Sequence, residues 1–167
     1  MLAMARVSEH LTSVATSPAS RTERDHVCLL AVSWRSNDRW PFLFAGNRDE
    51  YHARPAAAAD WWQDAPNILG GRDLAAGGSW LGISRDGRFA VVTNRPDLPA
   101  PKELRLSRGE LVTNWLTATD SPSADTLRST LTVMAPRYGG FSLLTGKLEG
   151  DNKGTLQCFS GGNQSSP

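Results

Sequence analysis

The chain has 167 residues, with 18 basic and 17 acidic side chains and a formal net charge of +1. This length suits one domain with a substantial core, and the balanced charge offers no basic field for nucleic acid, so a nucleic-acid-binding role is disfavoured. No window approaches the roughly 18 uninterrupted apolar residues of a membrane span, so no transmembrane segment is expected. The two cysteines, Cys28 and Cys158, are too few for a disulfide framework and lack zinc-site spacing, so no metal is expected.

The first 27 residues are rich in Ser, Thr, Ala and Arg and carry one acidic residue before Glu23. This composition is typical of a mitochondrial or plastid transit segment, and a disordered tail or a start codon assigned too far upstream explains it as well. We therefore expect a leader at 1–27, a folded domain at 28–160 and a disordered tail at 161–167. The expected location is cytoplasmic, or mitochondrial if the leader is a transit segment.

A β-hairpin is predicted where the domain begins, with strands over 28–34 and 41–46. If Asn37-Asp38 is a two-residue loop, Cys28 lies across from Asn47, give or take two residues. The second strand would then deliver a run of polar residues, Asn47, Arg48, Asp49 and Glu50, to the side of a thiol.

Two further segments follow the hairpin in the sequence. The glycine-rich stretch 70–80 lacks the ending of a P-loop, so it is interpreted as close backbone packing or a flexible loop beside a pocket rather than a phosphate site. The stretch 80–94 contains Asp86-Gly87 between two apolar runs, which predicts a hairpin whose second strand ends at Asn94.

Helices are expected in the second half of the chain. Ser107 and Glu110 have capping-box spacing, and the helix that they begin would bury Leu111, Val112, Trp115 and Leu116. A weaker helix from Ser121-Pro122 would end before Pro136, with Leu127, Leu131 and Met134 inward. Strands over 139–146 and 155–160 form a final pair. Strands, then helices, then strands favour a layered antiparallel α+β domain over alternating βαβ units.

The chemistry centres on Cys28, Arg48 and Asp49. Cys28 is either a small buried hydrophobe or a nucleophile, and a nearby guanidinium would favour its thiolate. The alternative for Arg48 and Asp49 is a set of ion pairs that pins the hairpin to the following loop, and Glu50 is interpreted as a cap or a solvent-facing group. The histidines give no imidazole base, so the remaining base would be the α-amine of Cys28, which requires removal of residues 1–27.

Several motifs occur together in one order: "CLLAVSW", "GNRDEYHARP", Trp61-Trp62, "ILGGRDLAAGGSWLGISRDGRFAVVTN", "SRGELV" and "YGGFSLLTG". With these motifs, the segment from Cys28 to about Phe159 resembles the NRDE family, also called the Transport and Golgi organisation protein 2 family. The resemblance implies an αββα sandwich like that of N-terminal-nucleophile hydrolases. It also implies catalytic roles for Cys28, Arg48, Asp49 and an oxyanion donor, Asn94, and a ligand-binding motif of Asn47, Arg48, Asp49, Glu50 and Trp80.

The function that the resemblance implies is binding or trafficking of a small hydrophobic metabolite. Haem or a lipid-related molecule is the expected ligand, with haem as cargo and with no resident cofactor. The alternative is a cysteine amidohydrolase that uses Cys28 after the leader is removed, and a third possibility is a non-functional truncated relative. Family members continue where this chain stops, so we expect a sandwich incomplete at its C-terminus, with an exposed sheet edge prone to association.

Overall fold

The computed structural model describes residues 3–5, 28–95, 106–120, 122–150 and 153–162. They form an antiparallel α+β structure, as predicted. The strands are β1 (Ala3–Ala5), β2 (Leu30–Trp34), β3 (Phe42–Gly46), β4 (Ala56–Trp61), β5 (Ile68–Asp73), β6 (Leu81–Ser84), β7 (Arg88–Asn94), β8 (Phe141–Glu149) and β9 (Lys153–Gly161). The helices are α1 (Gly109–Thr117), α2 (Ala124–Met134) and the short 3-10 helix η2 (Ala135–Arg137).

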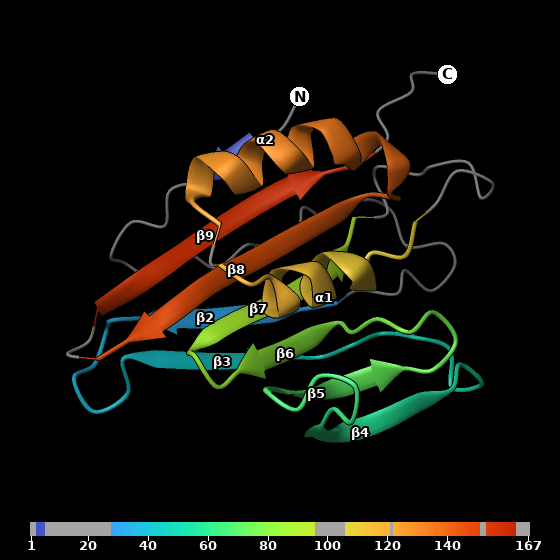
Figure 1. Cartoon of the computed structure of the whole chain (residues 1–167), viewed down its shortest axis with the longest axis horizontal. Coiled ribbons are helices and arrows are strands. Elements are labelled where there is room, and N and C mark those ends of the chain that lie inside the picture. The colour runs from blue at the N-terminus through green and yellow to red at the C-terminus, as the bar shows by residue number, and fades with distance from the viewer. Residues whose placement is uncertain (1–2, 6–27, 96–105, 121, 151–152, 163–167) are drawn as a thin grey trace, which may run out of the picture.

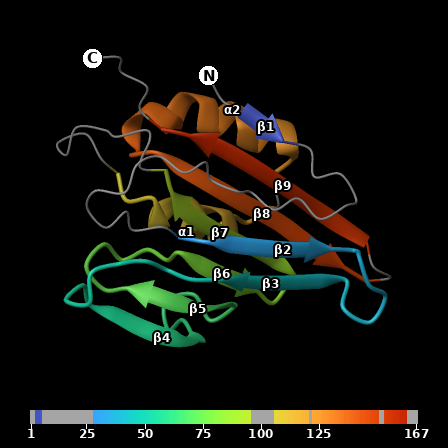
Figure 2. The same cartoon turned by 180° about the vertical axis from the view of Figure 1, so that it is seen from behind.

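The elements form three layers. The strands other than β2 and β3 make a seven-stranded sheet in the order β1-β9-β8-β7-β6-β5-β4, and β2 and β3 make a separate two-stranded sheet. Figure 1 shows α1 and α2 in front of the large sheet, and Figure 2 shows β2 and β3 across its opposite face. The order of the layers is therefore helices, large sheet, two-stranded sheet.

Alternation along β7 assigns its side chains to the two faces. Ala90 belongs to the core cluster under the helices, whereas Phe89 and Val91 belong to a second cluster with the two-stranded sheet. Successive residues of a strand point to opposite faces, so a short apolar run serves both layers. The helix-side cluster also holds the α1 face predicted from the sequence, which consists of Leu111, Val112, Trp115 and Leu116.

The β2–β3 hairpin is confirmed, but its predicted two-residue loop is wrong. The register pairs Val32 with Phe44, whereas the predicted loop would pair Val32 with Leu43, so the observed register differs by one residue. Residues 35–41 connect the strands. Pro41 has no N–H for a strand ladder, and the Asn37 side chain accepts hydrogen bonds from the backbone of Arg39 and Trp40, so the turn is longer.

The helix starts differ from the predicted ones. In α1 the N-cap is Arg108 without a side-chain cap, and the Ser107 hydroxyl accepts instead from the Gly109 N–H at 3.3 Å, so the capping box is wrong. In α2 the N-cap is Ser123, whose hydroxyl accepts from the Thr126 N–H at 3.1 Å. The helix ends at Met134, before Pro136, as predicted.

The glycine-rich stretch is partly a strand, which the sequence reading did not predict. β5 contains Gly70 and Gly71, and it pairs with β4, an edge strand that was not predicted either. A Cβ on Gly71 would lie 2.6 Å from the Trp80 ring, and one on Gly70 would lie 2.7 Å from the Leu81 carbonyl oxygen. These glycines therefore allow close backbone packing, which was one of the two interpretations of this stretch.

Little of the expected leader and tail falls within the described residues. Of residues 1–27 the structure describes only 3–5, which pair with β9 as strand β1. At the other end β9 runs to Gly161, one residue into the expected tail. Within the described part of the chain, neither α-helix has the length and apolar character needed to cross a membrane.

Candidate functional site

The β2–β3 hairpin brings Cys28 to the residues that follow β3. The Leu29 N–H donates to the Asn47 Oδ1 at 2.8 Å, and the Asn47 N–H donates to the Leu29 carbonyl at 3.1 Å, which extends the ladder past the end of β3. One step further, the Asp49 N–H donates to the Cys28 Sγ at 3.4 Å. The predicted position of Cys28, across from Asn47 within two residues, is confirmed.

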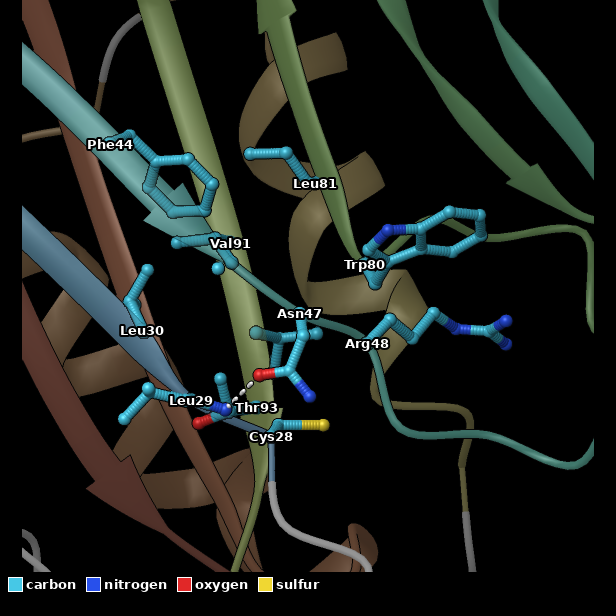
Figure 3. A pocket seen from close by; sticks show the side chains of 12 residues that line it. Cys28, Leu29, Leu30, Phe44, Asn47, Arg48, Trp80, Leu81, Val91 and Thr93 are labelled. Atoms are coloured by element: carbon cyan, nitrogen blue, oxygen red, sulfur yellow. Dashed lines mark hydrogen bonds between the residues drawn. The ribbon is translucent and has the colours of Figure 1, made fainter.

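An apolar niche of about 60 Å³ lies beside the sulfur atom. Figure 3 shows Cys28 at the bottom of the view, with the Asn47 carboxamide close above it and the side chains of Val91, Phe44 and Leu81 further up. The apolar lining residues are Leu29, Leu30, Phe44, Leu81, Val91 and Val92. They come from both sheets, so the niche exists because the small sheet packs on the large one.

A larger cavity of about 350 Å³ adjoins the niche. Its lining includes Cys28, Arg48, Asp49 and Glu50 from the hairpin and the residues after it, together with Trp80. The end of β7 contributes Asn94, and the start of α1 contributes Ser107, Arg108 and Gly109. Six of the seven predicted site residues therefore line this cavity, and the seventh, Asn47, lines the niche.

An ion-pair network crosses the cavity wall. Arg48 lies 3.2 Å from Glu50 and 3.9 Å from Asp73, and Arg54 lies 2.8 Å from Asp73 and 3.6 Å from Glu50. The Arg48 guanidinium also stacks over Trp80, 4.3 Å from the ring centroid, and Figure 3 shows it extending away from the sulfur. Both arginines pair with Glu50, so the interpretation of Glu50 as a solvent-facing group is wrong. Its Oε1 also accepts from the Tyr51 N–H at 3.0 Å, which agrees with the alternative interpretation as a cap.

Asp73 and Arg54 are site residues that sequence reasoning missed. Asp73 closes β5, and its Oδ1 accepts from the backbone N–H groups of Ala75 and Ala76 at 3.0 and 3.2 Å. Burial opposes ionisation, but the Arg54 hydrogen bond and these two amides outweigh it and hold the pKa of Asp73 below its usual value. An aspartate at the start of a glycine-rich turn was the available signal, because Asp commonly accepts from the amides that follow it.

The two cysteines have different surroundings. Both are free thiols, but only Cys28 lines the two cavities. Cys158 packs in the apolar cluster between the sheets, where burial raises the pKa of its thiol. His52 is exposed and is absent from the lining of either cavity, so Cys28 has no imidazole beside it among the described lining residues.

Comparison with known proteins gives the family. The family model for Transport and Golgi organisation 2 matches residues 27–166. The chain belongs to this family. The matched segment contains the whole hairpin, the ion-pair network and both α-helices, so the candidate site lies entirely within the residues that match the family model.

Relatives from several animals are also similar to this chain. The human Transport and Golgi organization protein 2 homolog is 37% identical over 129 residues, and its bovine counterpart is 36% identical over the same length. The Drosophila melanogaster Transport and Golgi organization protein 2 is 32% identical over 103 residues, covering 56% of this chain and 36% of the fly protein. The matched segment is 75% of this chain but only 45% of the human and bovine proteins, so the chain spans less than half of their length.

Proposed function

We propose that the chain binds a small, lipid-related metabolite at Cys28. The observation that carries this proposal is that four residues line both the apolar niche and the polar cavity, namely Cys28, Arg48, Trp80 and Val92. A ligand with an apolar end in the niche and a polar end in the cavity would touch both. Pockets that combine an apolar wall with a few convergent polar groups are the usual form of small-molecule sites.

A carrier role agrees with the names of the relatives, which refer to transport and Golgi organisation. Haem is the other cargo expected from the family resemblance, and the Cys28 sulfur is the lining atom that would serve as its axial ligand. The proposed location is the cytoplasm, or the mitochondrion if residues 1–27 direct the chain there.

Titration calorimetry with hexanamide and hexanoate, together with absorbance titration with haem, tests binding. We expect saturable binding of at least one probe, abolished by Thr93→Phe, which places a ring in the niche. The matched control is Thr132→Phe, at an exposed position on α2, which should bind like the original chain. Absence of saturable binding for all three probes would contradict the proposal.

A cysteine amidohydrolase is the second candidate, because Asn94 lines the cavity that holds the Cys28 sulfur and the Asp49 N–H bonded to it. In this mechanism the Cys28 sulfur attacks an amide carbonyl, its own α-amine takes the thiol proton, and Asn94 donates to the oxyanion. The C–N bond then breaks, the amine leaves with that proton, and water hydrolyses the resulting thioester to release the acid and the free thiol. Cys28 must then be the first residue of the mature protein. N-terminal sequencing and intact mass of the protein from its native cell decide this, and a retained leader would rule the mechanism out.

The αββα architecture is part of the same proposal, supported by the observed order of helices, large sheet and small sheet. A fourth, helical layer would cover the outward face of β2 and β3, where Leu43 is 47% exposed. A two-stranded sheet with uncovered edges tends to associate through them. Sedimentation velocity at increasing concentration measures that association, and a strictly monomeric chain would contradict it.

A further inference from the structure

The charged residues that the structure describes around the large cavity are balanced in sign. Among the described residues, three arginines and three carboxylates line it, namely Arg48, Arg54, Arg108, Asp49, Glu50 and Asp73, and none of the described lining residues is a lysine or a histidine. Their formal charges cancel at neutral pH. This balance differs from that of a site built for an anion, in which cationic donors exceed carboxylates.

The arginines also have partners within the protein. Arg54 donates through Nε to Asp73 at 2.9 Å, Arg48 donates to Glu50 at 3.2 Å, and Arg108 donates to the Gly140 carbonyl at 3.0 Å. An anionic ligand would have to break a guanidinium–carboxylate pair and leave a partly buried carboxylate behind. Such an exchange costs free energy, because the carboxylate stays partly buried but loses the ion pair that compensates for its lost hydration.

The start of α1 does not supply extra positive charge that could attract an anion. The Gly109 N–H is bonded to the Ser107 hydroxyl, and the Glu110 N–H is bonded to the Ser107 carbonyl at 3.0 Å. Glu110 also places an acidic side chain in the first turn, where it offsets the positive end of the helix dipole. The helix end therefore adds little attraction for an anion.

The polar group best suited to a neutral ligand is Asn94. Its carboxamide is both a donor and an acceptor without a charge, and it lines the same cavity as the Cys28 sulfur. An amide or ester carbonyl can hydrogen-bond to it without displacing an ion pair, while a short apolar arm occupies the niche.

From this we infer that the site selects an uncharged polar ligand of the amide or ester class, with a short apolar arm, over an anion of the same shape. The inference rests on the proposed function, since it names the class of ligand that the Cys28 site takes. It covers both binding and hydrolysis, because each would begin with the same ligand in the same cavity.

The test uses two alkylating reagents of nearly the same size, neutral iodoacetamide and anionic iodoacetate. Both react with the same thiolate, so the ratio of their rates at Cys28 is independent of how much thiolate is present. Peptide mass spectrometry resolves Cys28 from Cys158, and N-acetylcysteine amide gives the ratio for a thiol in water. We expect the normalised ratio at Cys28 to favour iodoacetamide by about threefold or more.

Matched variants change the charge of the cavity in opposite directions. Asp73→Asn leaves one excess positive charge and should lower the ratio, and Glu50→Gln should do the same if Asp73→Asn fails to fold. Arg54→Gln leaves one excess negative charge and should raise the ratio. The control Asp64→Asn removes a carboxylate that is 65% exposed and pairs with Arg72, outside the cavity, and should leave the ratio unchanged.

A normalised ratio below one in the original chain, or shifts of the same sign in the opposing variants, would overturn the inference. At about 1 M salt the differences among the variants should shrink, because exposed charges are then screened over about 3 Å. Failure of the proposed function has a different signature. In that case no titrated probe binds, whereas the alkylation ratio still reports the charge balance.

Discussion

The two faces of the seven-stranded sheet differ in what they contribute. On the helix face Phe141 and Phe159 are fully buried, and Leu143 is 1% exposed. On the opposite face the two-stranded sheet leaves its own aromatic residues half-buried, and the charged site lies at its open end. The helix side therefore holds the more deeply buried core, while the less densely covered side holds the candidate site.

The largest expected effect comes from truncating the helix face. Phe159→Ala should destabilise the chain by about 3–5 kcal/mol, because it leaves a cavity in a fully buried core. Phe42→Ala, on the half-buried hairpin face, is the matched variant and should cost about 1–2 kcal/mol, since less apolar area returns to water. Denaturant unfolding measures both, and equal costs would contradict the division between the two faces.

A second substitution tests whether the site itself contributes to stability. Asp73→Asn should cost about 1–3 kcal/mol, because it weakens the charged hydrogen bonds from Arg54 and leaves that guanidinium with Glu50. Thermal melting compared with the control Asp64→Asn checks the effect. A loss confined to the control would mean that the network lies outside the cooperative fold.

A smaller effect is expected at the start of α2. Ser123→Ala removes the side-chain acceptor for the Thr126 N–H and should cost about 1 kcal/mol. Ser123→Gly is the comparison, since glycine is tolerated at N-caps with a loss of only a few tenths. Urea midpoints of the two variants should therefore differ, and identical midpoints would show that the cap contributes nothing.

The smallest effect is a pH dependence carried by Asp73. Its pKa is lowered in the folded chain, so its contribution is present above the unfolded value of about 3.9 and is lost as the pH falls through the folded pKa. The stability difference between the original chain and Asp73→Asn should be constant near neutrality and shrink below about pH 4. Unfolding curves from pH 3 to 7 measure it, and a difference that grows toward acid would reverse the sign.

Much of the fold could be predicted because local patterns agree with it. The buried face of α1 followed from the spacing of Leu111, Val112, Trp115 and Leu116, and Asp86-Gly87 marked the β6–β7 turn. β4 was missed because its sequence, Ala-Ala-Ala-Ala-Asp-Trp, has neither alternation nor β-branched residues. It forms a strand because its backbone pairs with β5, and this pairing with another segment cannot be read from the local sequence pattern.

The candidate site shows the same limit. Cys28, Arg48 and Asp49 could be brought together from the hairpin register, because pairing is nearly local. Arg54 and Asp73 could not, since their contact depends on how β5 ends beside the loop that follows the hairpin. The proposed roles of the site residues, and the effect of residues 1–27 on them, remain predictions for the experiments above.

The hairpin register places the Cys28 sulfur against the Asp49 amide, and both residues line the large cavity. Methylthiolation of Cys28 in a Cys158→Ala background, followed by nitrogen-15 NMR, tests this placement. Outside the residues adjacent to Cys28 in sequence, we expect the Asp49 N–H to shift most, because it donates to that sulfur. An unmoved Asp49 amide, with the largest shifts elsewhere in the fold, would contradict it.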